Sequence, residues 1–121
     1  IRAVAELTRA HLPPGDLLIS SFNALAVLGH RALASGVASA WLLESAAAAE
    51  LPWLAHAGSV ALHPKHTLIT APRLARWKAQ VARVHTWTVN DPNRALELAA
   101  LGVDCLITDN PGKLRRALCP A

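Results

Sequence analysis

The sequence predicts an α/β protein in which about five strands of a parallel sheet alternate with helices. The best evidence is the stretch from Val84 to Pro111, where two apolar, β-branched segments flank a helical segment. Short turns join the three parts, so they form a strand–helix–strand unit. Such a unit makes its two strands parallel and gives the connection a right-handed sense.

The chain begins with a predicted helix over residues 1–12, in which apolar side chains recur at helical spacing. A Pro-Pro-Gly sequence at 13–15 ends this helix. A short strand is expected from Leu17 to Ser21. Its apolar residues are almost continuous, which is typical of a strand buried on both faces of a parallel sheet.

Asn23 is the expected N-cap of a second helix, which runs to about Ala34 and ends at the Ser-Gly pair 35–36. A strand from Val37 to Leu43 follows, with Glu44 at its carboxyl end. The Ala-rich segment 45–57 contains a proline, so a loop with a short helix is expected there.

A third strand is predicted from Ser59 to His63, and the residues from Pro64 to Leu68 are expected to form a connection. Thr70 is the expected cap of a helix that extends to Val81. The strand that begins at Val84 comes next and has alternating residues at period two.

The turn chemistry defines the ends of the following helix. Asp91 is a natural N-cap, and Pro92 takes the first helical position, where its missing N–H is not needed. Gly102 supplies the left-handed residue that ends the helix. A buried strand is then predicted from Val103 to Thr108, and Asp109 or Asn110 begins a last helix.

Composition narrows the classes of function. Hydrophobic residues make up 53% of the 121 residues, which is enough for a core. The net charge is +4, but the Lys and Arg residues are scattered over predicted helices. We therefore expect solvated helix faces and no nucleic-acid partner, because no block of like charge occurs.

No apolar run is long enough to cross a bilayer, so no membrane span is expected. Cys105 and Cys119 have no metal or redox spacing, and free thiols in a reducing cytoplasm are the expectation. The chain contains no Met and starts at Ile1 inside a helical pattern. These two facts predict that it is a fragment or a processed piece.

Two stretches carry a resemblance to a known family. The sequence HTWTVNDPNRALELAALGVDCLITDNP, from His85 to Pro111, closely resembles the C-terminal signature of the glycerophosphodiester phosphodiesterase family. LLISSFNALAVLGHRAL, from Leu17 to Leu33, resembles the Ser-Phe strand of the same family and the helix after it. One difference is Val81, at a position where the family usually has a glycine, so the preceding helix should end with different geometry.

The resemblance implies a TIM-type barrel, and it covers the second half of one. We therefore expect residues 1–121 to be a single partial domain, the C-terminal half of a TIM (β/α)8-type barrel. The family's His-Arg-Gly, Glu-x-Asp, His-Asp and Glu-x-Lys strands are not found in the sequence. Since those strands carry metal binding and catalysis in the family, no catalytic and no metal-ligating residue is assigned to this chain.

The resemblance also implies the chemistry of the intact enzyme. It would hydrolyse a glycerophosphodiester substrate to glycerol 3-phosphate and an alcohol, with a divalent metal, Mg²⁺ or Ca²⁺, held by carboxylates. This chain alone is expected to be inactive and to bind no such metal. The alternative is a non-enzymatic half-barrel module that binds phosphorylated small molecules or a protein partner.

Active sites of TIM barrels lie at the carboxyl ends of the strands, which selects four residues as substrate-pocket candidates. Trp87 is expected to line the pocket by resemblance, with interior packing as the alternative. Ser21 and Phe22 are assigned to the pocket wall by the Ser-Phe resemblance, although Ser21 could equally cap the next helix. Asn90 could bind substrate, but we favour a role in capping the helix that begins at Asp91.

Other polar residues are given structural roles. His63 and His66 have a metal-like spacing, but Pro64 disrupts the helix which that spacing requires. The His30-Arg31 pair looks like part of a His-Arg-Gly motif but falls in the middle of a predicted helix. Asp109 also begins a helix.

A half-barrel would leave two sheet edges and an apolar inner face uncovered, which favours association. A homo-oligomer of half-barrels is therefore expected.

Overall fold

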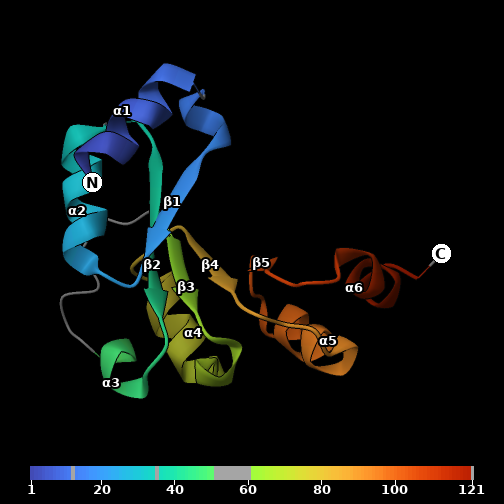
Figure 1. Cartoon of the computed structure of the whole chain (residues 1–121). Coiled ribbons are helices and arrows are strands. Elements are labelled where there is room, and N and C mark those ends of the chain that lie inside the picture. The colour runs from blue at the N-terminus through green and yellow to red at the C-terminus, as the bar shows by residue number, and fades with distance from the viewer. Residues whose placement is uncertain (12, 35, 51–60, 121) are drawn as a thin grey trace.

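A computed structural model describes residues 1–11, 13–34, 36–50 and 61–120 of the chain. Within these residues, five strands form one sheet in the order β1-β2-β3-β4-β5, and every neighbouring pair is parallel. Helices connect successive strands (Figure 1). The predicted α/β class and the number of strands are therefore confirmed.

The described elements, in chain order, are α1 (Arg2–His11), η1 (Pro14–Asp16), β1 (Leu18–Ser21), α2 (Ala24–Leu33), β2 (Ala38–Leu43), α3 (Ala46–Ala49), β3 (Ala61–Pro64), η3 (His66–Leu68), α4 (Ala71–Lys78), β4 (Arg83–Thr86), α5 (Pro92–Leu101), β5 (Cys105–Leu106) and α6 (Pro111–Leu118). The predicted loop and short helix over 45–57 is confirmed as far as α3. The rest of that segment, and the predicted strand start at Ser59, lie outside the described residues.

The main core lies between one face of the sheet and the helices α3 to α6. Alternate residues of neighbouring strands point to this face, among them Trp41, Leu62 and Val84. They contact helix residues such as Trp77 and Leu98, which are completely buried. Burying such large apolar side chains contributes about 1.5–3 kcal/mol each, so this one-sided layer holds the fold together.

The two edge strands differ from the prediction that they would be buried. In β1, Leu18 and Ile19 are only half-buried, and the predicted strand from Val103 to Thr108 shortens to the two residues of β5, of which Cys105 is exposed. Each edge strand has a neighbour on one side only. Its free side and its inner face therefore stay in contact with solvent, however apolar its residues are.

Four predicted helix starts are confirmed by hydrogen bonds from side chain to backbone. The caps are Asn23, Thr70, Asp91 and Asn110, and the last of these settles the choice between Asp109 and Asn110. Gly102 ends α5 with φ of 91°, the left-handed conformation that was predicted for it.

The predicted boundaries on either side of η3 need correction. Pro64 was expected in a connection but is the last residue of β3, where its carbonyl oxygen accepts from the Trp87 backbone N–H at 3.3 Å. A proline is tolerated at this strand end because the next residue, Lys65, donates its own N–H to Leu43 at 2.8 Å. Helix α4 ends at Lys78 rather than at Val81, and Ala79 caps it in a right-handed conformation, without a left-handed glycine.

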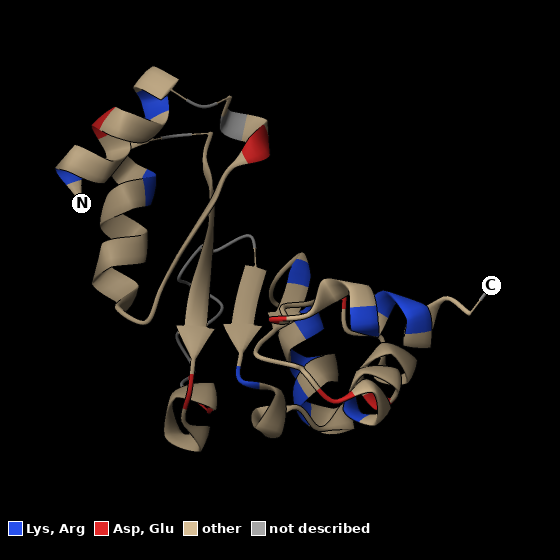
Figure 2. Cartoon of the chain, turned by 45° about the vertical axis from the view of Figure 1, so that its right-hand side comes forward, with Lys and Arg blue, Asp and Glu red and all other residues tan. Residues whose placement is uncertain are grey.

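Ion pairs connect the helical layer. Glu50, after α3, bonds to Arg73 at 2.9 Å and to Arg76 at 2.8 Å on α4. Lys78 at the end of α4 pairs with Asp104, just before β5, at 3.1 Å. Figure 2 shows that Lys and Arg residues are spread over several helices rather than gathered on one element. Among the described helices, none combines the length and apolar character needed to span a membrane.

The left-handed backbone at Gly102 generates a stability prediction. Substituting Gly102→Ala should lower the free energy of unfolding by about 1–2 kcal/mol, because a β-carbon is strained at positive φ. Gly15→Ala is the matched control, since its added β-carbon meets nothing within 4 Å and its φ is not positive. Urea unfolding curves of both variants check this, and equal losses would contradict it.

Candidate functional site at the carboxyl ends of the strands

Because all the strands are parallel, their carboxyl ends meet at one edge of the sheet. Phe22 follows the end of β1, and Trp87 follows the end of β4. Trp87 also forms a parallel bridge with Lys65, which follows β3. This bridge extends the sheet by one residue, so Trp87 is held by the backbone ladder and not by a loose loop.

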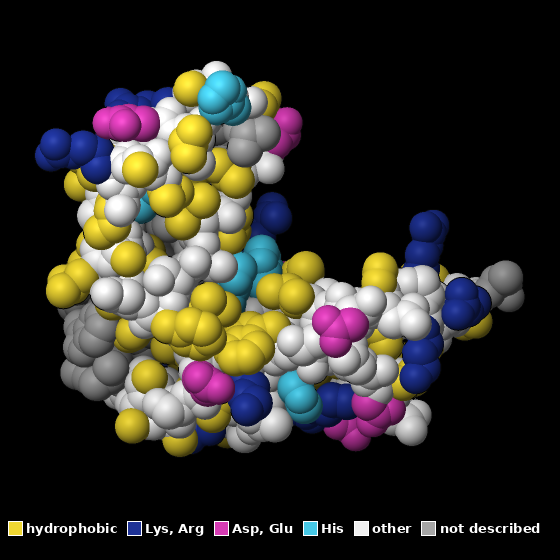
Figure 3. Space-filling model, viewed as in Figure 1, with side chains coloured by type: hydrophobic (Ala, Val, Ile, Leu, Met, Phe, Trp, Pro, Cys, Tyr) yellow, Lys and Arg dark blue, Asp and Glu magenta, His cyan; other side chains and the backbone are white. Residues whose placement is uncertain are grey.

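Phe22 and Trp87 contact each other although 64 residues of sequence lie between them. Their ring centroids are 5.6 Å apart with an interplanar angle of 81°, an edge-to-face arrangement. The Phe22 side chain is 53% exposed, so the pair presents an apolar surface to solvent. Hydrophobic side chains form a patch near the centre of the view in Figure 3.

Two indole N–H groups fix this aromatic pair. Trp87 Nε1 donates to the backbone oxygen of His63 at 2.6 Å, and Trp41 Nε1 donates to the backbone oxygen of Phe22 at 3.0 Å. The bond from Trp87 gives its own indole one preferred orientation, and the bond from the buried Trp41 holds the backbone at Phe22. The predicted pocket residues Phe22 and Trp87 are thus brought together in a fixed arrangement that the sequence did not reveal.

Ser21 is placed differently. Its register partner is Trp41, and it lines a cavity of about 220 Å³ beside α1 and α2, together with Ile19 and His30. Its hydroxyl accepts from the Asn23 backbone N–H at 3.1 Å. The alternative that Ser21 caps α2 is wrong, because the Asn23 side chain takes that role.

Asn90 does not cap α5, so the role that we favoured for it is wrong. The N-cap is Asp91, whose Oδ1 accepts from the Asn93 N–H at 3.0 Å. Instead, Asn90 Oδ1 accepts from Thr108 Oγ1 at 2.9 Å and from the Asp109 N–H at 3.0 Å, while its Nδ2 donates to Asp109 Oδ2 at 2.7 Å. Asn90 therefore ties the loop after β4 to the loop after β5.

His63 and His85 form a pair that the sequence analysis missed. His63 Nε2 and His85 Nδ1 are 3.1 Å apart, and the ring centroids are 5.0 Å apart. Burial and the neighbouring His85 ring lower the pKa of His63 from 6.5 to about 4. Burial and Arg83 also lower the pKa of His85. The signal was present in the two strand sequences, but only the register between them makes the residues neighbours.

The other candidates have structural positions. His30 lies inside α2, as expected, and is almost completely buried. Glu44 follows β2 and is exposed. Among the described residues, no three His, Cys, Asp or Glu side chains are close enough together to hold a metal ion. The Asp109 carboxylate, as described above, is bound to Asn90.

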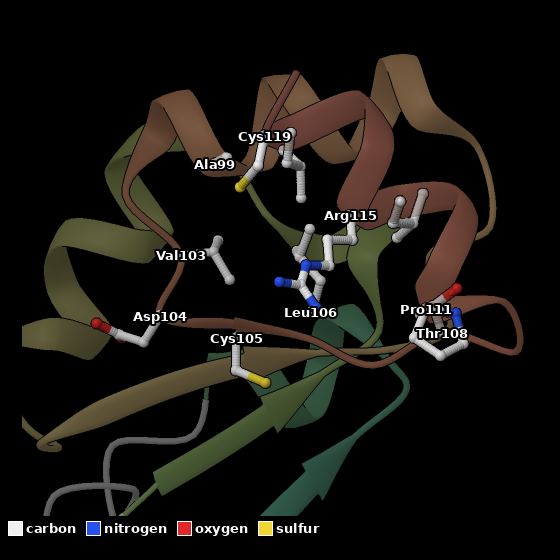
Figure 4. A pocket seen from close by; sticks show the side chains of 11 residues that line it. Ala99, Val103, Asp104, Cys105, Leu106, Thr108, Pro111, Arg115 and Cys119 are labelled. Carbon is white, nitrogen blue, oxygen red and sulfur yellow. The ribbon is translucent and has the colours of Figure 1, made fainter. Parts of the chain in front are cut away.

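A separate cavity of about 390 Å³ lies between α5, α6 and the edge strand β5. Figure 4 shows side chains from all three elements around it, including Arg115, Cys105 and Cys119. Both cysteines are exposed, and both are free, as predicted. The aromatic pair is not part of this lining, so the cavity is distinct from the candidate site.

Comparisons with known proteins place these features in a wider context. Residues 2–113 match the model of the glycerophosphoryl diester phosphodiesterase family. No curated protein sequence matches the chain. Several solved structures do, and the chain spans about half the length of each of those described next.

A phosphodiesterase from Oleispira antarctica, in complex with the product sn-glycerol-3-phosphate, is 29% identical with a TM-score of 0.83, over 96% of this chain and 47% of that one. A putative glycerophosphoryl diester phosphodiesterase from Silicibacter pomeroyi is 25% identical with a TM-score of 0.86, over 96% and 42%. A glycerophosphodiester phosphodiesterase from Parabacteroides distasonis, 24% identical with a TM-score of 0.77 over 97% and 50%, shows the same fold.

The Asn90 bonds predict a measurable contribution to stability. Asn90→Ala removes three hydrogen bonds between the two loops and should cost about 1–3 kcal/mol, with the loss reduced by their exposure to water. Asn93→Ala, three residues further along the chain, is the control, because the bond at Asn93 is made by its backbone. Urea unfolding should separate the two variants, and equal stability would refute the bridging role.

The low pKa of His63 predicts a pH dependence. Between pH 6.5 and about 4, the unfolded chain takes up a proton that the folded His63 does not. The unfolded state then binds more protons than the folded state. The free energy of unfolding should therefore fall as the pH falls through this window, and the contribution of His63 to stability should be complete above pH 6.5.

Urea midpoints measured from about pH 7.5 to 5 avoid most carboxylate titration. His63→Gln should reduce the slope and leave the part that comes from His85, whose pKa is also lowered. A wild-type midpoint that stays constant over this range would contradict the prediction.

Proposed function

This chain belongs to the glycerophosphoryl diester phosphodiesterase family, and from that premise we propose that it forms the C-terminal half of a barrel that hydrolyses glycerophosphodiesters. The reaction would release glycerol 3-phosphate and an alcohol. The observation that carries the proposal is the rigid aromatic pair at the carboxyl ends of the strands, where the active sites of such barrels lie. The product-bound relative from Oleispira antarctica supports the substrate class.

Phe22 and Trp87 would form one wall of the substrate cleft. Their apolar surfaces suit the carbon skeleton of a glycerol moiety, and they would exclude water from that side of the phosphate. Because the indole of Trp87 already donates to the His63 backbone oxygen, its N–H would not be needed by the substrate. Asn90 would act indirectly, by holding the loop after β4 in place.

The described residues do not fit the divalent metal of the reaction. Mg²⁺ and Ca²⁺ require six or more oxygen ligands in all, usually with several carboxylates among them. At the strand ends this chain offers Glu44 and Asp109, and in the part of the chain that the structure describes no three possible ligands come together. We therefore derive no metal-dependent step and assign no catalytic residue to this chain.

The open edges β1 and β5 would be the surfaces through which the chain completes a barrel. Unpaired backbone groups on an edge strand favour pairing with another strand. In the absence of the other half, copies of this chain would associate through these edges into a homo-oligomer. The exposed free thiols of Cys105 and Cys119 favour a reducing compartment such as the cytoplasm.

Activity measurements test the proposal. The chain alone should release no glycerol 3-phosphate from glycerophosphocholine with Mg²⁺ or Ca²⁺ present, because no three possible metal ligands come together among its described residues. Mixing it with the N-terminal half of the Oleispira antarctica relative should produce turnover.

In that mixture Trp87→Ala should lower kcat/KM at least about tenfold, a loss of about 1.4 kcal/mol of transition-state binding. Leu96→Ala, an exposed residue of α5, is the control. Turnover by the chain alone would contradict the proposed division of roles. Tight binding of sn-glycerol 3-phosphate by the chain without turnover in any mixture would favour the non-enzymatic module instead.

A further inference from the structure

Two imidazoles from neighbouring strands converge on the face of the sheet opposite to the main core. Leu62 of β3 is the register partner of Val84 of β4, so the next residues along each strand, His63 and His85, lie side by side. Leu62 and Val84 point into the core. Alternation along a strand therefore directs both histidines to the opposite face. Histidine side chains reach the surface near the centre of Figure 3.

The separation of the two nitrogens matches that of two ligands on one metal ion. Imidazole nitrogens lie about 2.0–2.1 Å from Zn²⁺, so two of them would be about 3.4 Å apart at a tetrahedral angle and about 2.9 Å apart at a right angle. His63 Nε2 and His85 Nδ1 are 3.1 Å apart, between these limits. We propose that this pair chelates a borderline divalent transition-metal ion, Cu²⁺ or Zn²⁺.

His63 is held in position by its strand as well as by its contact with the His85 ring. All four residues of β3 are buried, and His63 is 5% exposed. Its backbone oxygen also accepts the Trp87 indole N–H at 2.6 Å. These restraints leave His63 few alternative positions, so little conformational entropy would be lost when an ion binds.

The protonation state of the pair suits a metal ligand. Metal binding requires neutral imidazoles, and both rings have a lowered pKa for the reasons given above. In the metal-free pair one ring donates an N–H to the other. On binding, that ring would change tautomer, moving its proton to its other nitrogen, so both facing lone pairs would be free without any net release of protons.

An open cavity of about 480 Å³ gives an ion access to His85 and leaves room for water as the remaining ligands. Asp16 and Arg83 also line it. The Arg83 cation acts against a bound cation, and Asp104, which acts on His85 in the opposite sense, is itself paired with Lys78. Because the site has two protein ligands and nearby charges of both signs, its affinity for the metal ion should be moderate. Nitrogen ligands also distinguish the site from the oxygen-rich one that Mg²⁺ or Ca²⁺ would need.

Titration of the chain with Cu²⁺ and Zn²⁺ near pH 7.5 tests the proposal. Calorimetry should show one equivalent of moderate affinity, and the electron paramagnetic resonance spectrum of bound Cu²⁺ should show coupling to two nitrogens. His63→Gln and His85→Gln should each weaken binding at least about tenfold, equivalent to about 1.4 kcal/mol. His66→Gln and His11→Gln are the controls and should bind like the wild type.

His85 is only half-buried, so His85→Gln should fold even if His63→Gln does not. Wild-type affinity in His85→Gln, or a Cu²⁺ spectrum without coupling to two nitrogens, would overturn the proposal. A large excess of Mg²⁺ should not displace the ion, and displacement would mean that oxygen ligands hold it. None of these measurements depends on phosphodiesterase activity, so they do not test the proposed function.

Discussion

Packing of the main hydrophobic core against one face of the parallel sheet is the constraint on which the rest of this structure depends. Helices α3 to α6 cover the face that carries Trp41, Leu62 and Val84, and their apolar side chains form the main core. The other face carries the histidine pair and is not part of this core. A parallel sheet normally has both faces covered.

The parallel direction of the strands explains how the candidate site is built. Parallel strands bring the residues after β1, β3 and β4 to one edge, where backbone oxygens become available as acceptors. The indoles of Trp41 and Trp87 use two of these oxygens, so the aromatic pair is oriented by the sheet itself. Asn90 uses side-chain bonds to fix the neighbouring loops. The arrangement of the aromatic pair is therefore set by the fold itself.

Local chemistry made much of the fold predictable. The caps at Asn23 and Asp91 and the left-handed Gly102 depend on a few neighbouring residues, so the sequence was sufficient to place them. The burial of β1 and β5 was not predictable from apolar composition, because it depends on whether a neighbouring strand is present. Pro64 was misplaced since a proline at a strand end resembles a proline in a turn.

The site was predictable only in part, for a related reason. Phe22 and Trp87 were found through the family resemblance, but their contact depends on the order of the strands. The pairing of His63 with His85 requires the register of β3 and β4. The role of Asn90 was misassigned because its partners at Thr108 and Asp109 are 18 and 19 residues away in sequence. Local capping rules cannot anticipate such long-range partners.

The bridge made by Asn90 has a mechanical consequence. The loop that follows Trp87 is tied through Asn90 to Asp109, and Asn110 beside it caps α6. The start of α6 and the loop that leaves the aromatic pair are therefore joined by side-chain hydrogen bonds, and not only by the course of the chain.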